Sequence, residues 1–317
     1  MTRIWFIVDY PFNQIEFEKR FATEVACKEY LFRLRFPDGF VCPLCANTDF
    51  WKRTRDRVTC NKCLHEFSPL NGTLFHKSHL SLALWFRAAW WITNQKQGVS
   101  ALGLQRALGL GSYRTSWMLL QKLRTAMVRS HRDLLRGDIE ADEIWLGGVG
   151  PAGKKMRKNK RLILVCVEKN GTRIGRIRMK LIPDTKGETL LSGILECVET
   201  GSTIETDGWQ GYLNIDQHGY KHERKITPES RTDMRENGIL PLVHRVSSLF
   251  KRWVLGTYQG RVDTKHLPAY LDEFVFRFNR RTSKSRGLLF YRLLETSVQM
   301  KSKPYRKIIR PNQQFPA

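Results

Sequence analysis

Hydrophobic positions in the first third of the chain recur at helical spacing. One helix is predicted over residues 14–35, with an apolar face made of Phe17, Phe21, Val25, Leu31 and Phe32. The stretch Phe36-Pro37-Asp38-Gly39 ends that helix. A second, very apolar helix is predicted over residues 80–93. The sequence between the two helices is polar and turn-rich, which favours short strands and loops.

Residues 99–128 predict two helices around a tight break. A short helix over 99–108 is followed by Gly109-Leu110-Gly111, and Ser112 can cap a longer helix that ends near residue 128. This arrangement is typical of a helix-turn-helix whose second helix enters the DNA major groove, although a plain helical hairpin has the same pattern. The DNA-binding interpretation assigns phosphate or base contacts to Arg114, Lys122 and Arg124.

From residue 138 the pattern changes to strands. Strands are predicted over 138–146, 161–168 and 172–182, with a hairpin turn at Asn170-Gly171. A helix over 187–197, a strand over 202–207 and helices over 243–255 and 266–281 follow, whereas weak periodicity predicts a loop or insertion over 213–241. The fold class is therefore α/β, with a mixed-sheet domain of the ribonuclease-H-like type over 138–282.

Charge changes this picture because the chain is strongly basic. Its 317 residues carry 54 Lys+Arg against 30 Asp+Glu, a formal charge of +24, while 41% hydrophobic residues are enough for a folded core. Such a charge indicates a polyanionic partner, most often nucleic acid. No stretch reaches the roughly 18 apolar residues that span a bilayer, and the run at residues 4–8 is too short for a signal peptide. We therefore expect a cytoplasmic, nucleoid-associated protein.

The basic residues are concentrated in two segments. Residues 151–180 and 277–310 each hold eleven Lys/Arg and one acid, while 181–223 hold eight acids and two bases. A phosphodiester enzyme needs this contrast between cations that hold DNA and carboxylates that hold metal. A solvated hairpin tip and a flexible basic tail over 283–317 would also explain it. The first segment supplies four further candidate DNA contacts: Lys154, Lys155, Arg157 and Lys158.

Four of the seven cysteines form two CxxC motifs separated by 14 residues. Two such motifs can place four thiolates around Zn²⁺, which predicts a structural zinc ribbon over 39–79. Two unrelated reduced pairs are the weaker alternative. The ligands would be Cys42, Cys45, Cys60 and Cys63, and Cys27, Cys166 and Cys197 are predicted to be buried thiols. A helical segment over 1–38 precedes the ribbon, and the helix-turn-helix region over 80–132 follows it.

Two aspartates stand where a sheet could present them together. Asp142 lies in the first predicted strand and Asp207 ends the fourth, so neighbouring strands would bring both carboxylates to one point. Paired carboxylates hold the hard divalent cations that assist phosphodiester chemistry. Glu140 and Glu205 share the same strand faces, so alternation does not choose between the pairs. A single strand-end Asp is more often a cap or a turn residue.

The helix predicted from residue 243 adds a third element. Its apolar residues fall on one face, and His244, Ser248 and Lys251 fall on the opposite face. A polar stripe of this composition can face a metal and phosphate site, although the solvent-facing side of an amphipathic helix has the same pattern.

Over nearly its whole length the chain resembles insertion-sequence transposases of family 1595, the ISXO-like transposases. The resemblance rests on PDGFVCPLC with CNKC, IEADEIWLGG, TDGWQGY, and HRVSSLFKRWVLGTYQG followed by HLPAYLDEFVFRFNRR. It implies a DDE-type nuclease domain that cuts and joins transposon ends with Mg²⁺ or Mn²⁺. Asp142 matches the first catalytic aspartate and Asp207 the second.

The third catalytic position departs from the DDE pattern. The family's acidic residue falls on His244, and the lysine seven residues later is Lys251, which would contact a phosphate; related members have Asn or His in that place. A neutral imidazole favours Mn²⁺ over Mg²⁺ as the ion that is bound. Alternatively, His244 could shuttle a proton near neutral pH.

The predicted function is that of a DNA transposase that binds terminal inverted repeats of its element and carries out strand cleavage and transfer. Double-stranded DNA is the partner, and we expect a dimer or a larger complex because two DNA ends must meet. Three alternatives remain: an inactive transposase-derived DNA-binding protein, a nuclease that never rejoins strands, and an RNA-binding basic protein.

Overall fold

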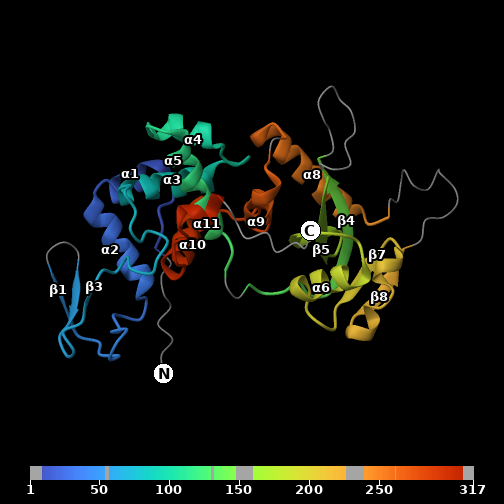
Figure 1. The fold of residues 1–317 in the computed structure, drawn as a ribbon, viewed down its shortest axis with the longest axis horizontal. Helices are drawn as coiled ribbons and strands as arrows, with labels where there is room; N and C mark the ends of the chain where they lie inside the picture. The colour runs from blue at the N-terminus through green and yellow to red at the C-terminus, as the bar shows by residue number, and fades with distance from the viewer. Residues whose placement is uncertain are drawn as a thin grey trace. The chain divides into compact units, whose positions relative to one another are not determined.

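A computed structural model gives the fold of the protein (Figure 1). The described residues form two compact units, one from 9–129 together with 282–309 and the other from 132–281. We call them the helical unit and the sheet unit. The structure describes residues 9–53, 57–129, 132–147, 160–225, 239–260 and 262–309.

Helices α1 (Gln14–Arg20) and α2 (Glu24–Arg35) replace the single helix that the periodicity predicts. The reason is Thr23, whose extended backbone breaks the helix and whose hydroxyl accepts a hydrogen bond from the Ala26 N–H. Because the helical phase restarts there, Val25 is 61% exposed instead of lying on the buried face.

An aromatic cluster forms the core of the helical unit. It joins α1 and α2 to α3 (Leu82–Asn94) and α10 (Arg286–Gln299). The ring centroids of Phe17 and Trp90 are 4.7 Å apart, and those of Phe86 and Phe290 are 5.7 Å apart. Aromatic pairs at these separations add to the stabilisation from burial.

The alternative explanation, a flexible basic tail over 283–317, does not hold for the described residues of this segment. Helix α10 buries Leu289, Phe290, Leu293 and Leu294, each at most 1% exposed, and a short helix α11 (Tyr305–Ile309) follows. The many basic residues of this segment make it look like a polar tail in the sequence, although its apolar residues have helical spacing. A Cβ atom at Gly287 would lie 1.8 Å from the Pro11 carbonyl oxygen, so the start of α10 is tightly packed.

The two-helix prediction for residues 99–128 is confirmed in outline. Helix α4 (Ala101–Leu108) ends at Gly109 with a φ of 61°, and Ser112 caps α5 (Tyr113–Thr125) by accepting from the Thr115 N–H. Both signals are local, which explains why the sequence alone located them.

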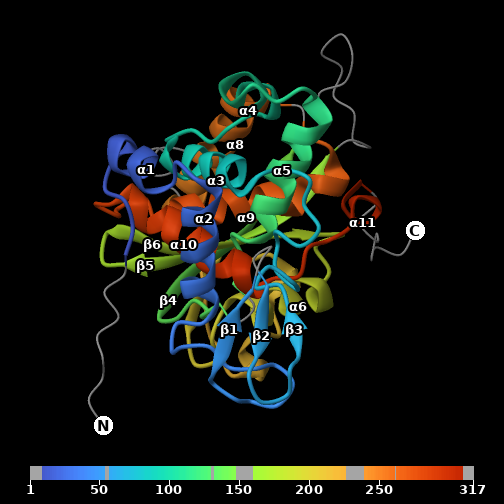
Figure 2. The same cartoon turned by 90° about the vertical axis from the view of Figure 1, so that its left-hand side faces the viewer.

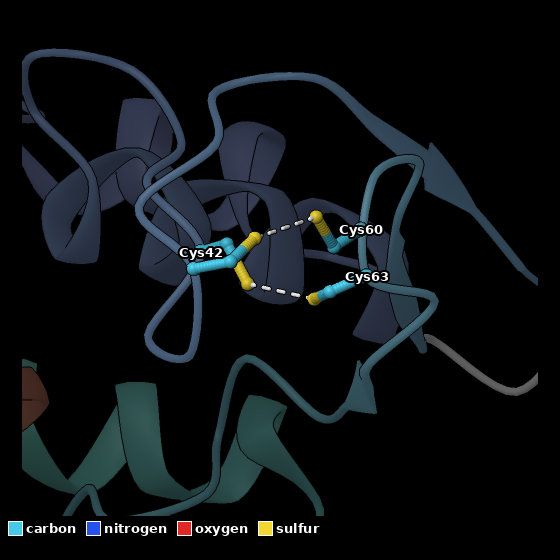
Figure 3. A group of neighbouring side chains, drawn as sticks. Cys42, Cys60 and Cys63 are labelled. Carbon is cyan, nitrogen blue, oxygen red and sulfur yellow. Dashed lines mark hydrogen bonds between the residues drawn. The ribbon is translucent and has the colours of Figure 1, made fainter.

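The cysteine-rich segment forms a small antiparallel sheet. Strands β1 (Phe50–Lys52), β2 (Val58–Cys60) and β3 (Glu66–Phe67) lie in that order (Figure 2). Phe40, Val58 and Phe67 fill its core, and Phe32 of α2 packs against it. The four cysteines gather at one end of this sheet, with their sulfur atoms turned toward one another (Figure 3).

The sheet unit contains a five-stranded mixed sheet. Strands β4 (Asp138–Leu146), β5 (Arg161–Asn170) and β6 (Arg173–Ile182) form an antiparallel meander. Strands β7 (Thr203–Thr206) and β8 (Lys221–Arg224) add to the other side of β4 in parallel, giving the order β6-β5-β4-β7-β8. This confirms the ribonuclease-H-like topology.

Strand β8 lies within the segment predicted as a loop or insertion, and so does a short 3-10 helix, Asp216–His218. A second 3-10 helix, Gln210–Tyr212, comes just before that segment. All four of the strand's residues are polar, so no alternation of apolar positions marks it.

Helices cover both faces of the sheet (Figure 1). On one face, α6 (Gly187–Cys197) packs Leu190 and Ile194 against β4 and β5. On the other face, α8 (Pro241–Tyr258) and α9 (Leu267–Phe278) pack against β5 and β6. None of the helices in the described part of the chain is both long enough and apolar enough to span a membrane.

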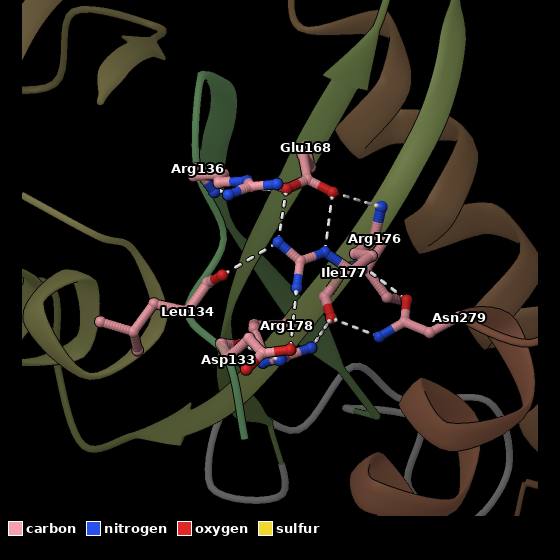
Figure 4. Close-up of polar contacts among 8 residues, drawn as sticks. All are labelled: Asp133, Leu134, Arg136, Glu168, Arg176, Ile177, Arg178 and Asn279. Carbon is pink, nitrogen blue, oxygen red and sulfur yellow. Dashed lines mark hydrogen bonds and ion pairs between the residues drawn. The ribbon is translucent and has the colours of Figure 1, made fainter. Parts of the chain in front are cut away.

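Polar contacts join strands β5 and β6 to the segment that precedes β4 and to the end of α9 (Figure 4). Glu168 accepts two hydrogen bonds from the Arg176 guanidinium, at 2.8 and 3.0 Å, and one from the Arg136 N–H. Burial raises the pKa of Glu168, but these donors together lower it by more, so the pKa lies below its ordinary value. Asn279, just after α9, pairs with both the N–H and the carbonyl of Ile177 and thereby covers part of the exposed edge of β6.

Candidate functional site

Parallel pairing of β4 with β7 brings the two predicted aspartates together. Glu140 is the register partner of Glu205. Asp142 and Asp207 each lie two residues further along, at the carboxyl end of the paired region. Their strands are therefore neighbours, which is the condition that the sequence prediction required.

Glu140 is engaged in holding helix α8. Its side chain is on the α8 face of the sheet and the residue is 2% exposed. Its Oε2 atom accepts from the N–H groups of Leu242 and Val243, at 2.8 and 3.0 Å. Pro241 begins this helix and Leu240 cannot cap it with a side chain. A carboxylate from a strand about a hundred residues earlier therefore caps the helix N-terminus.

Glu205 is engaged as well. It is 8% exposed, and the Nζ atom of Lys169 lies 2.7 Å from its Oε1 atom. Asp142 and Asp207 each accept a backbone hydrogen bond with one carboxylate oxygen, from Glu143 N–H and Trp209 N–H respectively. The structure therefore separates the two acidic pairs that strand alternation could not distinguish.

The electrostatics of Asp142 show which groups surround it. Burial and, to a lesser extent, the charge of Asp207 raise the pKa of its carboxyl from 3.8 to about 6, although the hydrogen bond from the Glu143 N–H and the charge of His244 act in the opposite direction. The three predicted site residues are thus close enough to interact. A bound cation would relieve the repulsion between the two carboxylates.

Helix α8 presents His244 and Lys251 on its exposed side, while Val243, Val246 and Phe250 are buried against the sheet. His244 follows directly after the turn that Glu140 caps, so the same contact that starts the helix also positions the imidazole. Within the described residues, the four cysteines are the group of three or more ligand side chains whose donor atoms all lie within 4.8 Å. The carboxylate–imidazole site is therefore more open than the cysteine site.

A second buried carboxyl lies on the opposite face of β4. The Tyr212 hydroxyl donates to Glu143, and burial raises the pKa of Glu143 to about 7. The sequence pattern predicts no role for Glu143 or Tyr212, and none for Glu140 as the residue that caps α8. Tyr212 belongs to the TDGWQGY motif, which marks it as a candidate. Its contact with Glu143 and that of Glu140 with α8 join residues far apart in the sequence, so no local pattern predicts them.

The cysteine group has the geometry of a closed zinc site. The Sγ atoms of Cys42 and Cys63 are 3.6 Å apart, as are those of Cys45 and Cys60. A tetrahedral site with Zn–S bonds of about 2.3 Å has S···S edges of about 3.8 Å. The Cys63 N–H donates to Cys60 and helps to lower the pKa of that thiol to about 6, which favours the thiolate form that zinc binds.

The predicted DNA contacts fall into four groups. Arg114 is exposed at the start of α5, with its guanidinium 4.0 Å from the Tyr305 ring centroid. Lys122 is half-buried near Trp85, and burial lowers its pKa. Arg124 is 1% exposed, so it cannot reach a phosphate at the surface, which corrects the expectation for this residue. The last group lies outside the described residues: Lys154, Lys155, Arg157 and Lys158.

Comparison with protein families finds matches over both regions. The ISXO2-like transposase domain of the IS1595 family matches residues 134–279, and the transposase zinc-ribbon domain of the same family matches residues 22–66. The chain is therefore similar to IS1595 transposases in two separate regions. The first match spans the carboxylate–imidazole site, and the second spans the four cysteines, whose arrangement supports the structural zinc of an IS1595-type ribbon.

Two further similarities accompany these IS1595 matches. A protein of the transposable element ISH50 of Halobacterium salinarum is 22% identical over 279 residues, which are 82% of this chain and 92% of that protein. A chain in the structure of a simian T-cell lymphotropic virus intasome with PP2A regulatory subunit B56 gamma is 16% identical. That match covers 59% of this chain and 70% of the viral complex's chain, with a TM-score of 0.31.

Proposed function

We propose that this transposase cuts and joins DNA at the terminal inverted repeats of its own element, with Asp142, Asp207 and His244 holding a divalent cation. The observation that carries the proposal is the contrast between the two acidic pairs on β4 and β7. Glu140 and Glu205 are engaged by α8 and Lys169, whereas Asp142 interacts electrostatically with Asp207 and His244, and neither aspartate has an ion-pair partner among the described residues.

The donor set fits a hard or borderline divalent cation. Two carboxylates and one imidazole supply oxygen and nitrogen ligands, a combination that Mn²⁺ accepts more readily than Mg²⁺. When bound, the cation would activate a water molecule or a 3′-hydroxyl for in-line attack on a phosphodiester. Glu140 keeps α8 in place, so His244 stays beside the two aspartates. Lys251, two helical turns further along the exposed side of α8, would contact a phosphate at the cleavage point.

The helical unit would supply DNA recognition. Its zinc ribbon and its α4–α5 helix pair are the candidates for binding the inverted repeat, with Arg114 as the exposed candidate on α5. Cutting both ends of one element requires two active sites, so we expect a dimer or larger assembly on DNA.

The test uses a labelled duplex that carries the element's terminal repeat, incubated with the full-length protein in Mn²⁺ or Mg²⁺. We expect metal-dependent cleavage at the repeat, faster in Mn²⁺, and none with Asp142→Ala. A joined product that depends on the 3′-hydroxyl would distinguish a transposase from a nuclease. Specific binding without cleavage in either metal would instead favour a transposase-derived DNA-binding protein.

His244 has its own test. His244→Ala should abolish cleavage while leaving binding of the repeat unchanged, because the side chain is exposed on α8 and contributes little to the core. Cleavage at the wild-type rate would show that the imidazole is neither a ligand nor a proton carrier.

A further inference from the structure

A groove of about 400 Å³ lies in the helical unit between helix α2 and the zinc-ribbon segment. The α2 side and the ribbon side belong to one packed body, because Phe32 of α2 contacts the ribbon core around Phe40 and Val58. None of the residues assigned to the metal site or the helix-turn-helix lines this groove.

The groove has an apolar floor and a cationic rim. Phe32, Val58 and Leu70 contribute to its floor. Among the described residues that line it, the rim carries five basic residues and one acid, Glu29, which gives these residues a net charge of +4. The basic residues are Lys28, Arg33, Lys52, Arg53 and Arg57.

The rim charges remain accessible to a ligand. Arg33 lies 3.9 Å from Asp9 and Arg57 lies 3.3 Å from Glu66, but their side chains are 68% and 54% exposed. Surface ion pairs of this kind are weak and exchange readily with other anions. Arg53 lies over the ring of Trp51, which is 46% exposed on the neighbouring strand surface.

We propose that this groove binds a single strand of DNA, with phosphates on the cationic rim and a sugar or an unstacked base on the apolar floor. Proteins that bind single strands combine these two features. A groove of about 400 Å³ has room for a sugar or an unstacked base but not for a duplex, whereas the α4–α5 pair offers a helix suited to a major groove. The inference rests on the proposed function in one respect, which is that the ligand is DNA. Binding of a single strand can be measured without any cleavage, so the two proposals can fail separately.

The experiment measures fluorescence anisotropy of a labelled oligodeoxythymidylate and of a labelled duplex, without Mg²⁺ or Mn²⁺ and at several salt concentrations. The groove variant is Arg33→Gln/Lys52→Gln/Arg53→Gln. The matched control removes the same number of exposed charges from the same unit, as Lys19→Gln/Lys77→Gln/Lys96→Gln. Zinc content and far-UV circular dichroism are compared so that a folding defect is recognised.

We expect the groove variant to bind the single strand at least about tenfold more weakly, with the salt-dependence slope reduced by about 2, because each lost phosphate contact on single-stranded DNA reduces it by about 0.7. The control should change this affinity by less than about threefold, and the groove variant should weaken binding of the single strand more than it weakens binding of the duplex. Equal losses for the two variants, or a loss confined to the duplex, would overturn the proposal.

A positional readout complements the affinities. Photocrosslinking of a strand that contains 5-bromodeoxyuridine should label peptides containing Phe32 or residues 50–53 in the wild-type protein. Crosslinks confined to α4 and α5 would also overturn the proposal.

Discussion

Two rows of acidic residues lie on the same pair of strands, two residues apart, and their surroundings differ completely. The inner row, Glu140 and Glu205, is buried and compensated by the N-terminus of α8 and by Lys169. The outer row, Asp142 and Asp207, lies at the carboxyl end of the paired strands beside His244, and its charges repel. Residue type and strand position are therefore poor guides to function, because the groups that approach from other elements decide it.

The comparison also separates stability from chemistry. The inner row stabilises the fold because Glu140 holds the N-terminus of α8, which begins about a hundred residues later in the sequence. In the outer row, ionised Asp142 destabilises the metal-free fold, because burial, together with the nearby charge of Asp207, raises the pKa of its carboxyl. Opposite effects of substitution in the two rows are therefore expected.

The largest effect is expected for Asp142→Asn. Losing one carboxylate from the site should reduce cleavage by at least about a thousandfold, because the cation and the charge that it stabilises in the transition state are lost together. Cleavage is measured in single-turnover assays with Mn²⁺, and Glu205→Gln serves as the control on the same strand pair. A loss of similar size in the control would show that the two rows act as one site.

Glu140→Gln should give the next largest effect, this time on stability. A neutral amide can keep at most part of the charged hydrogen bonding to the first turn of α8, so we expect a loss of about 2 kcal/mol in the free energy of unfolding. Urea titration followed by circular dichroism measures this loss. Cleavage should fall with it, because His244 follows that turn. Unchanged stability would mean that Pro241 and local packing suffice to start the helix.

How much of this arrangement the sequence predicts depends on how local each signal is. The strand over 138–146 and the helix over 187–197 have the predicted bounds, because periodicity and flanking glycines mark them. Asp142 and Asp207 follow from strand ends and from the resemblance. The sequence pattern alone does not favour Asp142 over Glu140 as the metal ligand. That choice depends on the two backbone N–H groups, about a hundred residues away, that engage the Glu140 carboxylate.

Other errors have the same origin. The sequence prediction missed α10 because the many basic residues of this segment obscured its apolar face. That face packs against α2 and α3 in the helical unit, whose first residues lie near the other end of the chain. Strand β8 has four polar residues and exists because β7 offers a parallel edge. Tertiary contacts decide such elements, and single-sequence periodicity cannot register them.

The pH dependence of Asp142→Asn gives a smaller, directional effect. The pKa of Asp142 in the folded protein, about 6, lies above its ordinary value of 3.8, so the folded state binds this proton more tightly than the unfolded state. Its contribution to stability is full below that ordinary value and is lost as the pH rises through about 6. Without Mg²⁺ or Mn²⁺, the variant should therefore melt above wild type at about pH 7 and no longer do so at about pH 4. Adding Mn²⁺ should raise the melting temperature of the wild type only. A variant that melts below wild type at neutral pH would contradict a repulsive outer row.

The smallest effect is expected for Glu205→Gln, which tests whether the two members of the inner row are equivalent. Lys169 is 28% exposed at its side chain, so water can solvate the ammonium group when its carboxylate partner becomes an amide. Partly exposed ion pairs contribute little, and we expect a loss below about 1 kcal/mol, compared with about 2 kcal/mol for Glu140→Gln. Urea unfolding of the two single variants and the double variant gives both values and their coupling. If Glu205→Gln were the more damaging change, the ion pair with Lys169 would hold the row together, and the capping of α8 would be secondary.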